Sequence, residues 1–401
     1  MHQYITTKFS KKYRVMSEYL VLLLFVLTAV YSFFSYTQFY NEKYESFGLV
    51  TKFLYVLRYV SVIVFILNFL ILKLERRQLY ICIGFIAIDF ILKKFTGKHV
   101  LFEICFLPLC LAQCVNRKKF CNVLLATLIV CFFLILFGHF LGYFTNEVFY
   151  RGDLIRETYG FCHPNTLGLV VLVISFVYVL KRDCFNFVDA IFLLSLSIFC
   201  YLFPRSITSA ACILMLIVFS FISNYFKKMQ LSNKSKNIIF IVSISFILTV
   251  IFFSYLFSLT GIGKDTLINM PGSIWARFEL GKIALERYDI SLFGTPVEFF
   301  HPDSEKGITE YFVVDCLYIF MPLNYGLIVS LLFFAFFIYI IYKSIIAGEY
   351  KLLFIMLILV LYSVSEITVF DRIMIPIFAF IFCSSKNSTG RRKAEREESN
   401  L

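Results

Sequence analysis

Arginine, histidine and amide side chains gather where polar segments meet long apolar runs. The segment 156–165, with the sequence R-E-T-Y-G-F-C-H-P-N, contains Arg156, His163 and Asn165 and leads directly into an apolar run, and Arg205 interrupts a later run. A guanidinium group binds two phosphate oxygens at once, and an imidazole can take the proton from a hydroxyl group. These residue types therefore predict group transfer from a phosphate-linked substrate to a hydroxyl acceptor.

The second half of the chain repeats this association of polar residues with the ends of apolar runs. The candidates there are Arg277, His301, Asp315, Tyr318, Glu366 and Arg372. His301 is the preferred proton acceptor because it lies in a long polar segment, and His163 and Glu366 are the alternatives. We expect the remaining candidates of both halves to bind the substrate.

Each candidate also has a structural alternative. An arginine at the end of a membrane span commonly anchors that span at the lipid headgroups, although Arg205 lies in an outer connection of almost no length. His163 can shape the turn that precedes an apolar run, and a histidine in the polar segment can be a surface residue. Glu366 and Asp371 can form a structural ion cluster with Arg372.

The composition decides which elements position these residues. The chain has 401 residues, of which 60% are hydrophobic and only 16% are charged. Soluble domains contain about 45–50% apolar and about 25% charged residues, so this composition excludes a soluble protein. The apolar residues form long unbroken runs rather than alternating, which favours membrane-spanning helices over an outer-membrane barrel. The predicted fold is an all-α, polytopic bundle of about twelve transmembrane helices.

Hydropathy places the twelve predicted spans, and the basic residues orient them. The spans are at about 18–36, 53–72, 79–92, 100–115, 120–144, 166–180, 186–203, 207–226, 237–258, 312–342, 351–367 and 373–384. Most of the 38 Lys and Arg residues fall on one side of this arrangement, which identifies that side as cytoplasmic and accounts for the net charge of +12. Both termini are therefore predicted to be inside.

Two long segments lie on the outer side of this arrangement, at 145–165 and at 259–311. Loops of this length usually carry function, so any chemistry is expected on the outer face. The chain then divides into spans one to nine (1–258), the large outer loop (259–311), spans ten to twelve (312–384) and a charged, disordered tail (385–401). Within the large loop, 274–288 has the pattern of an amphipathic helix lying on the membrane surface.

The cysteines and histidines suggest no metal site, because the sequence contains neither a CxxC nor an HExxH motif. Most of the 12 cysteines fall in or beside apolar runs, where they behave as small hydrophobic residues. Only Cys162 and Cys316 lie near predicted outer loops, which leaves a weak case for a disulfide bond.

The ordered polar segments resemble a known family. The sequence of 156–165 resembles the R-x-x-x-G-F-x-H-P-N signature of bacterial polysaccharide polymerases of the Wzy type, within the O-antigen ligase and polymerase superfamily. Pro204-Arg205-Ser206 resembles the S/P-R-S/T element between adjacent spans of that family. The segments 277–294 and 315–326 resemble the R…L-x-G pattern of its large loop and the D-x-x-Y…G opening of the next span.

This resemblance implies a metal-independent membrane glycosyltransferase of the GT-C kind, without a cofactor. Such an enzyme joins undecaprenyl-diphosphate-linked oligosaccharide repeat units into capsular or exopolysaccharide, on the outer face of a bacterial cytoplasmic membrane. The implied partners are the lipid-linked donor and acceptor, membrane lipid, a chain-length regulator and a flippase, and no nucleic acid. The implied diphosphate ligands are Arg156, Arg205 and Arg277, with His301 or His163 as the base.

Two other functions compete with this one. An O-antigen-ligase-like transferase attaches finished chains to a different acceptor, and sequence separates it poorly from a polymerase. A flippase or transporter of lipid-linked oligosaccharide also has about twelve spans. A transporter is expected to show internal repeats and polar residues at the bilayer midplane, whereas here the polar residues concentrate at predicted span ends. The polymerase is therefore the preferred prediction.

Overall fold

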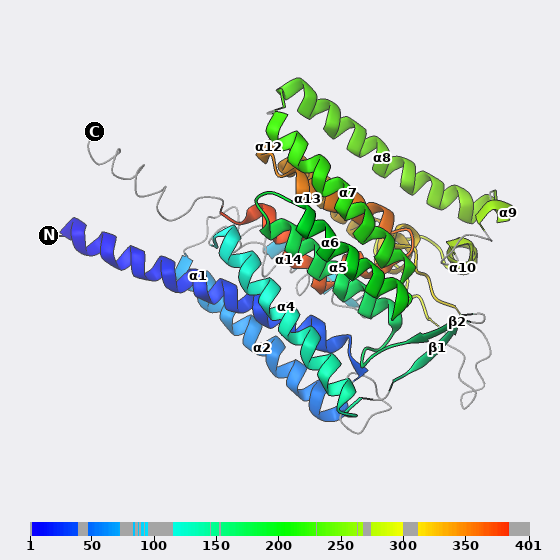
Figure 1. The fold of residues 1–401 in the computed structure, drawn as a ribbon, viewed down its shortest axis with the longest axis horizontal. Helices are drawn as coiled ribbons and strands as arrows, with labels where there is room; N and C mark the ends of the chain where they lie inside the picture. Colours follow the sequence, from blue (N-terminus) through cyan, green and yellow to red (C-terminus); the bar gives the residue numbers. More distant parts are fainter. Residues whose placement is uncertain are drawn as a thin grey trace. The chain divides into compact units, whose positions relative to one another are not determined.

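The chain is mostly helical in the computed structural model (Figure 1). The structure describes residues 2–38, 47–72, scattered positions between 83 and 94, and 115–384 except 145, 152–153, 230, 263, 268–273 and 300–311. The predicted spans at 79–92 and 100–115 lie largely outside these described residues, as does the tail. The described residues form two compact units, which are treated separately below.

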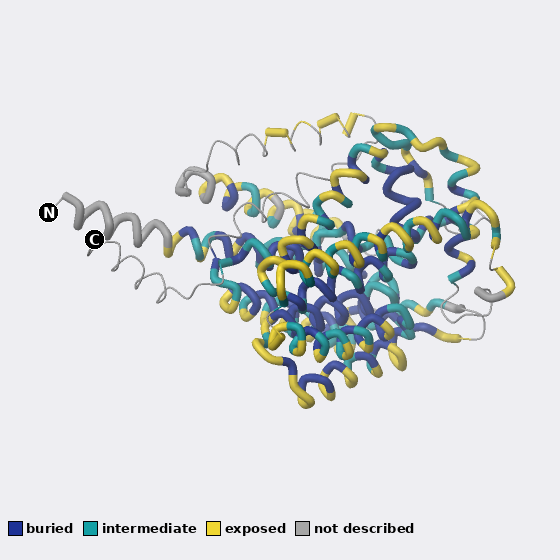
Figure 2. The backbone as a smooth tube through the Cα atoms, turned by 90° about the horizontal axis from the view of Figure 1, so that it is seen from above, coloured by how far each residue is buried: buried dark blue, intermediate teal, exposed yellow. Residues whose placement is uncertain are grey.

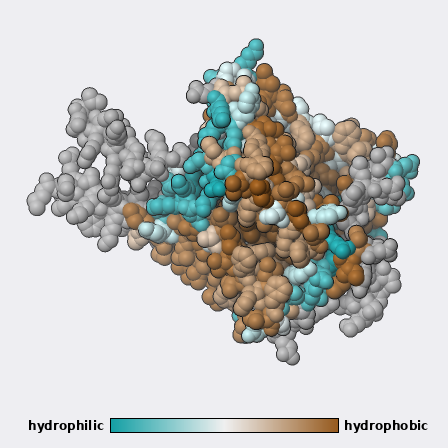
Figure 3. Space-filling model, viewed as in Figure 1, coloured by the Kyte–Doolittle hydropathy of each residue, from teal (hydrophilic) through white to brown (hydrophobic). Residues whose placement is uncertain are grey.

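Six described helices are long and apolar enough to cross a membrane. They are Val15–Ser35, Arg117–Phe140, Pro164–Lys181, Ile207–Met229, Asn233–Thr260 and Gly326–Ala347. At about 1.5 Å per residue, helices of this size match a hydrocarbon core of roughly 30 Å. Hydrophobic side chains also cover most of the surface that Figure 3 shows. The prediction of a multi-pass helical membrane protein is confirmed, whereas twelve spans are not established.

The first unit is built around four helices: α1 (His2–Ser35), α2 (Phe47–Leu72), α4 (Arg117–Phe140) and α5 (Pro164–Lys181). α1 packs on α2 and α4, and α4 packs on α5. Most of α5 is buried, and Figure 2 shows dark blue buried stretches alternating with yellow exposed ones along the chain. Two short segments near the end of the chain, α14 (Ile375–Ala379) and η6 (Phe380–Phe382), belong to the same unit.

The helices of the first unit have a defined direction. Lys119 of α4 forms an ion pair with Glu18 of α1 at 3.1 Å, and Phe25 meets Phe120 with ring centroids 4.8 Å apart. Glu18 lies midway along α1 and Lys119 lies at the start of α4. Farther along both helices, Gly160 lies close to Ile135 of α4 and bonds to Gln38 just after α1, so α1 and α4 run parallel. α5 begins where they end and runs back, so Lys181 lies at the same end of the unit as Lys119.

A β-hairpin lies between α4 and α5, formed by β1 (Val148–Arg151) and β2 (Leu154–Glu157). The strands are antiparallel, and Phe149 pairs with Arg156. This hairpin is a small β element in a mostly helical chain, which is consistent with the predicted all-α membrane protein.

Among its described residues, the second unit contains seven helices of eight residues or more. They are α6 (Phe187–Leu202), α7 (Ile207–Met229), α8 (Asn233–Thr260), α10 (Ile274–Arg287), α11 (Leu317–Asn324), α12 (Gly326–Ala347) and α13 (Tyr350–Tyr362). α7 and α13 are antiparallel neighbours, because Phe219 stacks on Phe354 at 4.8 Å and Phe226 contacts Tyr350. α8 packs along α12, and the Lys236 ammonium donates to the carbonyl of Ile346.

The prediction of one span over 312–342 is wrong, because the structure divides this run into α11 and α12 at Tyr325. Gly326 has a φ of +85°, which a helix cannot accommodate and glycine tolerates best. The segment around residues 291–295 is bonded to this break: Thr295 donates its N–H to the carbonyl of Leu323 at 2.7 Å, and Leu327 donates its N–H to the carbonyl of Ser291 at 3.0 Å. The break is therefore an anchoring point for the large loop.

The last two predicted spans are also corrected. The predicted span 351–367 is α13, which ends at Tyr362 and, at 13 residues, is too short to cross a bilayer alone. The predicted span 373–384 is a broken series, η5 (Arg372–Met374), α14 and η6. Another short helix, η4 (Ile367–Phe370), separates α13 from this series.

Candidate functional site

The candidate residues fall into a cluster in each unit, and each cluster is described by itself. In the first unit, a tight turn precedes the helix α5. Tyr159 and Gly160 both have positive φ values, +49° and +87°, and Phe161 donates its N–H to the carbonyl of Thr158 at 3.0 Å. This is the backbone pattern of a type I′ turn, in which a tyrosine is strained. The Asn146 side chain accepts the N–H groups of Thr158 and Tyr159 and stabilises the turn.

The same turn is fastened to the end of α1. Gln38 donates its N–H to the carbonyl of Gly160 at 3.1 Å, and Cys162 donates to the carbonyl of Tyr36 at 2.9 Å. These bonds join positions more than 120 residues apart in the chain. They fasten the backbone that leads into the His-Pro-Asn segment to the end of α1.

His163 caps the N-terminus of α5. Its backbone is extended, and its Nδ1 atom accepts the N–H of Asn165 at 3.1 Å. Pro164 occupies the first helical position, where its missing N–H costs no hydrogen bond. The Phe149 ring lies 4.8 Å from the imidazole centroid at an interplanar angle of 71°. The capping role considered for His163 is thus present in the structure.

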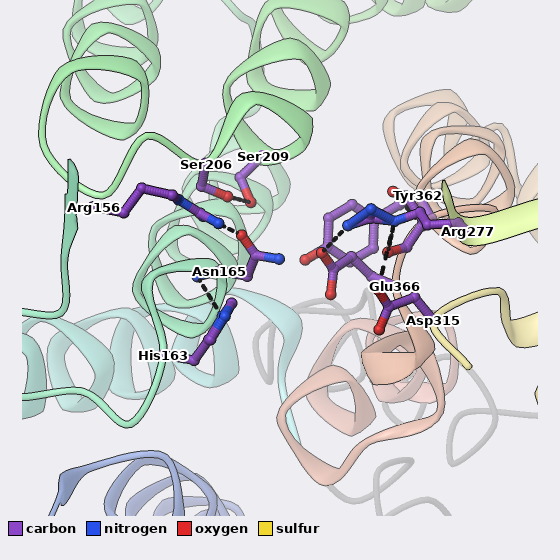
Figure 4. A network of polar contacts seen from close by, with 10 residues as sticks. Arg156, His163, Asn165, Ser206, Ser209, Arg277, Asp315, Tyr362 and Glu366 are labelled. Atoms are coloured by element: carbon purple, nitrogen blue, oxygen red, sulfur yellow. Dashed lines mark hydrogen bonds and ion pairs between the residues drawn. The ribbon is translucent and has the colours of Figure 1, made fainter. Parts of the chain in front are cut away.

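Arg156 is the buried cation of this cluster. Its side chain extends from β2 to α5, where its guanidinium donates to Oδ1 of Asn165 (Figure 4). Because an arginine only donates, Oδ1 of Asn165 is the acceptor of this contact. The structure therefore brings together three of the predicted residues, Arg156, His163 and Asn165.

Burial raises the pKa of the Cys162 thiol beside this cluster. A thiol of raised pKa is largely protonated near neutral pH and is a poor nucleophile. Cys162 and Cys316 are both free thiols in the structure, so the possible disulfide bond between them is not formed.

The second unit places Arg205 in a short turn between α6 and α7. Its φ of +49° lies in the left-handed region, which costs about 1–2 kcal/mol for a residue with a side chain. The turn is closed by the N–H of Ser206, which donates to the carbonyl of Cys200 at 2.9 Å, and by the Ser206 hydroxyl, which donates to Ser209 at 3.1 Å. Within the described part of the chain, the Arg205 guanidinium has neither a hydrogen bond nor an ion pair.

Unlike Arg205, Arg277 is buried, and its guanidinium contacts several oxygen atoms. Its Nε atom donates to the carbonyl of Ser365 at 2.9 Å, and a terminal nitrogen donates to Oε1 of Glu366 at 3.3 Å (Figure 4). Asp315 contributes a second carboxylate, with Oδ2 at 3.8 Å from Nε. One guanidinium thus faces two carboxylates, and this group of three ionisable side chains has a net negative charge when all are ionised.

The helix α10 positions Arg277 by close packing. Phe278 packs on Phe257 of α8 with centroids 5.3 Å apart, and Gly281 allows a close approach to α11, since an added Cβ atom would lie 2.6 Å from Cδ1 of Ile319 and would require that side chain to shift. The prediction of a helix at 274–288 is confirmed. However, its apolar face packs on α8 and α11 of the protein, so the expectation that this face lies on the membrane surface is not supported.

Tyr318 and Arg372, two of the predicted substrate ligands, both form hydrogen bonds within the protein. The Tyr318 hydroxyl donates to the carbonyl of Val360 at 2.7 Å, and the Tyr318 carbonyl accepts the hydroxyl of Tyr255, so Tyr318 ties α8, α11 and α13 together. Arg372 donates its backbone N–H to the Asp371 carboxylate. His301, the preferred proton acceptor from sequence, lies outside the described residues.

Sequence reasoning missed the partner of Glu366. We considered Arg372, which is close in sequence, whereas the structure pairs Glu366 with Arg277 of α10. The carbonyl of Ser365, which completes the arginine site, was also missed. In the sequence, only the position of Ser365 next to Glu366 could have indicated this contact.

Comparison of the chain with protein-family models, with curated proteins and with solved structures finds no match. The fold therefore defines the class of this protein as a multi-pass helical membrane protein. Of its candidate arginines, Arg156 lies on β2, Arg205 in the turn between α6 and α7, and Arg277 on α10.

Proposed function

We propose that this protein is a polysaccharide polymerase that joins undecaprenyl-diphosphate-linked oligosaccharide repeat units on the outer face of a bacterial cytoplasmic membrane. The resemblance of its ordered segments to Wzy-type polymerases supports this function. In the reaction, the bond between the growing chain and its diphosphate breaks, and a new glycosidic bond forms to a hydroxyl of the incoming unit. The hydroxyl proton passes to a base, and undecaprenyl diphosphate leaves.

The direction of the helices supports an outer location for the first cluster. Arg156 and His163 lie at the end of the first unit where α4 finishes and α5 begins. The opposite end carries the basic residues that flank these helices, Arg117, Lys118, Lys119, Lys181 and Arg182. Since basic residues concentrate on the cytoplasmic side, the cluster is expected outside.

The connection after α5 extends this topology to the second cluster. Only five residues, 182–186, separate α5 from α6, and they are too few to cross a bilayer. α6 therefore begins on the cytoplasmic side. α7, which is long enough to cross a membrane, follows Arg205 and ends at the basic residues Lys227 and Lys228, so Arg205 is expected on the outer side. The antiparallel arrangement of α7 and α13 places Glu366 at the same end of the second unit as Arg205, opposite Lys227 and Lys228.

The observation that carries the proposal is the left-handed backbone conformation of Arg205, together with the absence of a partner for its guanidinium among the described residues. A charged residue in a strained, left-handed conformation is expected where function requires it. Without a protein partner among the described residues, its guanidinium can take two oxygens of a lipid-linked diphosphate. Arg277 is committed to carbonyl and carboxylate oxygens, so Arg205 is the better diphosphate ligand in the second unit.

The carboxylates beside Arg277 are suited to the proton transfer. Glu366 and Asp315 share one guanidinium, so one carboxylate can accept a proton while the other retains the ion pair. We therefore favour Glu366, with Asp315 as its neighbour in this role, over His163, while His301 remains a candidate base.

Deletion of the gene in its native host tests this function. Loss of a polymerase is expected to leave single repeat units on the lipid and to abolish long surface glycan, and the wild-type gene should restore the polymer. Accumulation of finished polymer on the lipid would instead identify a ligase-like enzyme. Complete loss of repeat units from the outer leaflet would identify a flippase, and either of these results would contradict the proposal.

A further inference from the structure

The helix α6 has one buried side and one exposed side. Its buried positions recur every three or four residues, at Ala190, Leu193, Ser197 and Cys200. The exposed apolar side chains between them include Ile191, Leu194, Ile198, Tyr201 and Leu202. This spacing places the two sets on opposite sides of a helix. α6 therefore presents a continuous apolar face to the surroundings of the second unit.

This apolar face extends to the turn that carries Arg205. Tyr201, Leu202 and Phe203 are all exposed, and they end two positions before Arg205. The helix α7, on the other side of the turn, differs, because its first large exposed hydrophobic residue is Leu214. The exposed apolar surface and the cation therefore adjoin each other on the α6 side of the turn.

The charge of Arg205 is not neutralised by a carboxylate in the ranges that the structure describes. Residues 187–229, which include α6 and α7, contain one acidic residue, Asp189. Its carboxylate is bound at the opposite end of α6, where Oδ2 accepts the N–H of Asn186 at 3.0 Å. Glu366, at the same end of the second unit as Arg205, forms an ion pair with Arg277. Arg205 can therefore serve an anion from outside the chain.

An apolar face that ends at such a cation has the chemistry of a site for a lipid with an anionic head. The guanidinium can bind two oxygens of a diphosphate, and the exposed side chains of α6 can pack against a hydrocarbon chain. The helix α12 of the same unit provides a contrast. It also exposes apolar residues, including Leu331 and Leu332, but residues 317–330 around its start contain no charged side chain. Ordinary membrane lipid can cover both helices, whereas of these two α6 alone adjoins an anion ligand.

We propose that the polyprenyl chain of the lipid-linked substrate lies along the exposed face of α6 while its diphosphate is bound by Arg205. This inference rests on the proposed function and deepens it, because it names the surface that binds the lipid part of the substrate. A diphosphate carries more negative charge than the single phosphate of a common phospholipid, so the guanidinium favours the polyprenyl lipid over the surrounding bilayer.

Photocross-linking tests the position of the chain. A photoreactive p-benzoylphenylalanine replaces Ile198 on the proposed face or, as the matched control, Leu331 at a similar distance from the outer end of α12. The purified full-length variants in nanodiscs receive labelled undecaprenyl diphosphate as a small fraction of the total lipid. We expect labelling at 198 to exceed labelling at 331 by about tenfold or more and to fall by a similar factor with Arg205→Gln, which corresponds to the loss of one charge-assisted hydrogen bond. Labelled phosphatidylglycerol and uncharged undecaprenol should label the two positions alike.

Equal labelling of the two positions by undecaprenyl diphosphate would overturn the inference, because it would indicate ordinary lipid contact. Labelling at 198 that persists with Arg205→Gln would also overturn it. Arg205→Gly removes the guanidinium and relieves the strained φ, so it provides the same comparison if Arg205→Gln folds poorly. The proposed function fails separately. Selective labelling at 198 by a protein that forms no polymer from lipid-linked repeat units would retain the lipid surface and contradict the polymerase.

Discussion

Glu366 accepts a hydrogen bond from Arg277 at 3.3 Å, although 89 positions separate the two residues in the chain. The side chains are 9% and 12% exposed, so the pair lies mostly out of water. Removal of one partner from such a pair leaves a buried charge without full compensation, and this is usually more costly than the loss of a surface ion pair.

Arg277→Met should destabilise the second unit by about 3–5 kcal/mol, because Glu366 and Asp315 then lose their shared counter-ion. Thermal unfolding of the purified protein in detergent measures this effect. The surface pair Lys282–Glu286 provides the control, since both residues are exposed and Lys282→Met should change stability by less than about 1 kcal/mol. Equal unfolding temperatures for the two variants would show that the Arg277 cluster contributes little.

Glu366→Gln should lower polymer formation by about 10²–10⁴-fold, the usual effect of removing a general base. The amide retains an oxygen for Arg277, and Asp315 remains as the counter-ion, so the protein should still fold. The measurement uses purified lipid-linked repeat unit at equal protein concentration. Activity within threefold of the wild type would eliminate Glu366, and parallel assays of Asp315→Asn and His301→Ala would then identify the base.

Gly326→Ala should break the anchoring point of the large loop. An added Cβ would lie 2.4 Å from the backbone nitrogen of Gly294 and from the carbonyl oxygen of Leu292, and the φ of +85° is also unfavourable. We expect a loss of more than about 3 kcal/mol. Gly348→Ala is the matched control, because its φ is also positive but no atom lies within 4 Å of the new Cβ. Similar thermal unfolding of both variants would contradict the close contact.

The predicted topology can be tested at an exposed native thiol. Cys184 is exposed and follows the basic end of α5, so an impermeant thiol reagent should label it only after the cells are permeabilised. A cysteine introduced at the exposed position 264 should react in intact cells, measured in a Cys184→Ser background. Labelling of Cys184 in intact cells would reverse the orientation and with it the outer location of both clusters.

The parts of the fold that hydropathy determines could be predicted from sequence. The spans at 166–180, 207–226 and 237–258 agree with α5, α7 and α8 to within a few residues at each end, since long apolar runs determine these helices. The break at Tyr325 could not be predicted in this way. The run there is apolar throughout, and the break depends on backbone contacts with the loop around Gly294.

Part of the candidate site could likewise be predicted from sequence, and part could not. The residues Arg156, His163 and Asn165 are close in sequence, and a local turn with a helix start brings them together. The hairpin that carries Arg156 was missed because each strand has only four residues, although Gly152 and Asp153 gave a turn signal. The pairing of Arg277 with Glu366 depends on the packing of α10 against α8 and α11, which no local pattern specifies.

The central claim is that Arg205 is held in a strained conformation in order to bind substrate diphosphate. Glycine relieves the strain of a positive φ, so Arg205→Gly should unfold at the same or a higher temperature, with a gain of up to about 1–2 kcal/mol. Arg205→Lys keeps the charge but loses the two-point contact with phosphate.

The most direct test is the length of polymer formed from purified lipid-linked repeat unit by Arg205→Gly and Arg205→Lys, each at wild-type protein concentration. We predict that both variants fold and that both leave the substrate almost entirely as single repeat units. Wild-type polymer from both variants would contradict the account and show that Arg205 is only an anchor at the end of a membrane span.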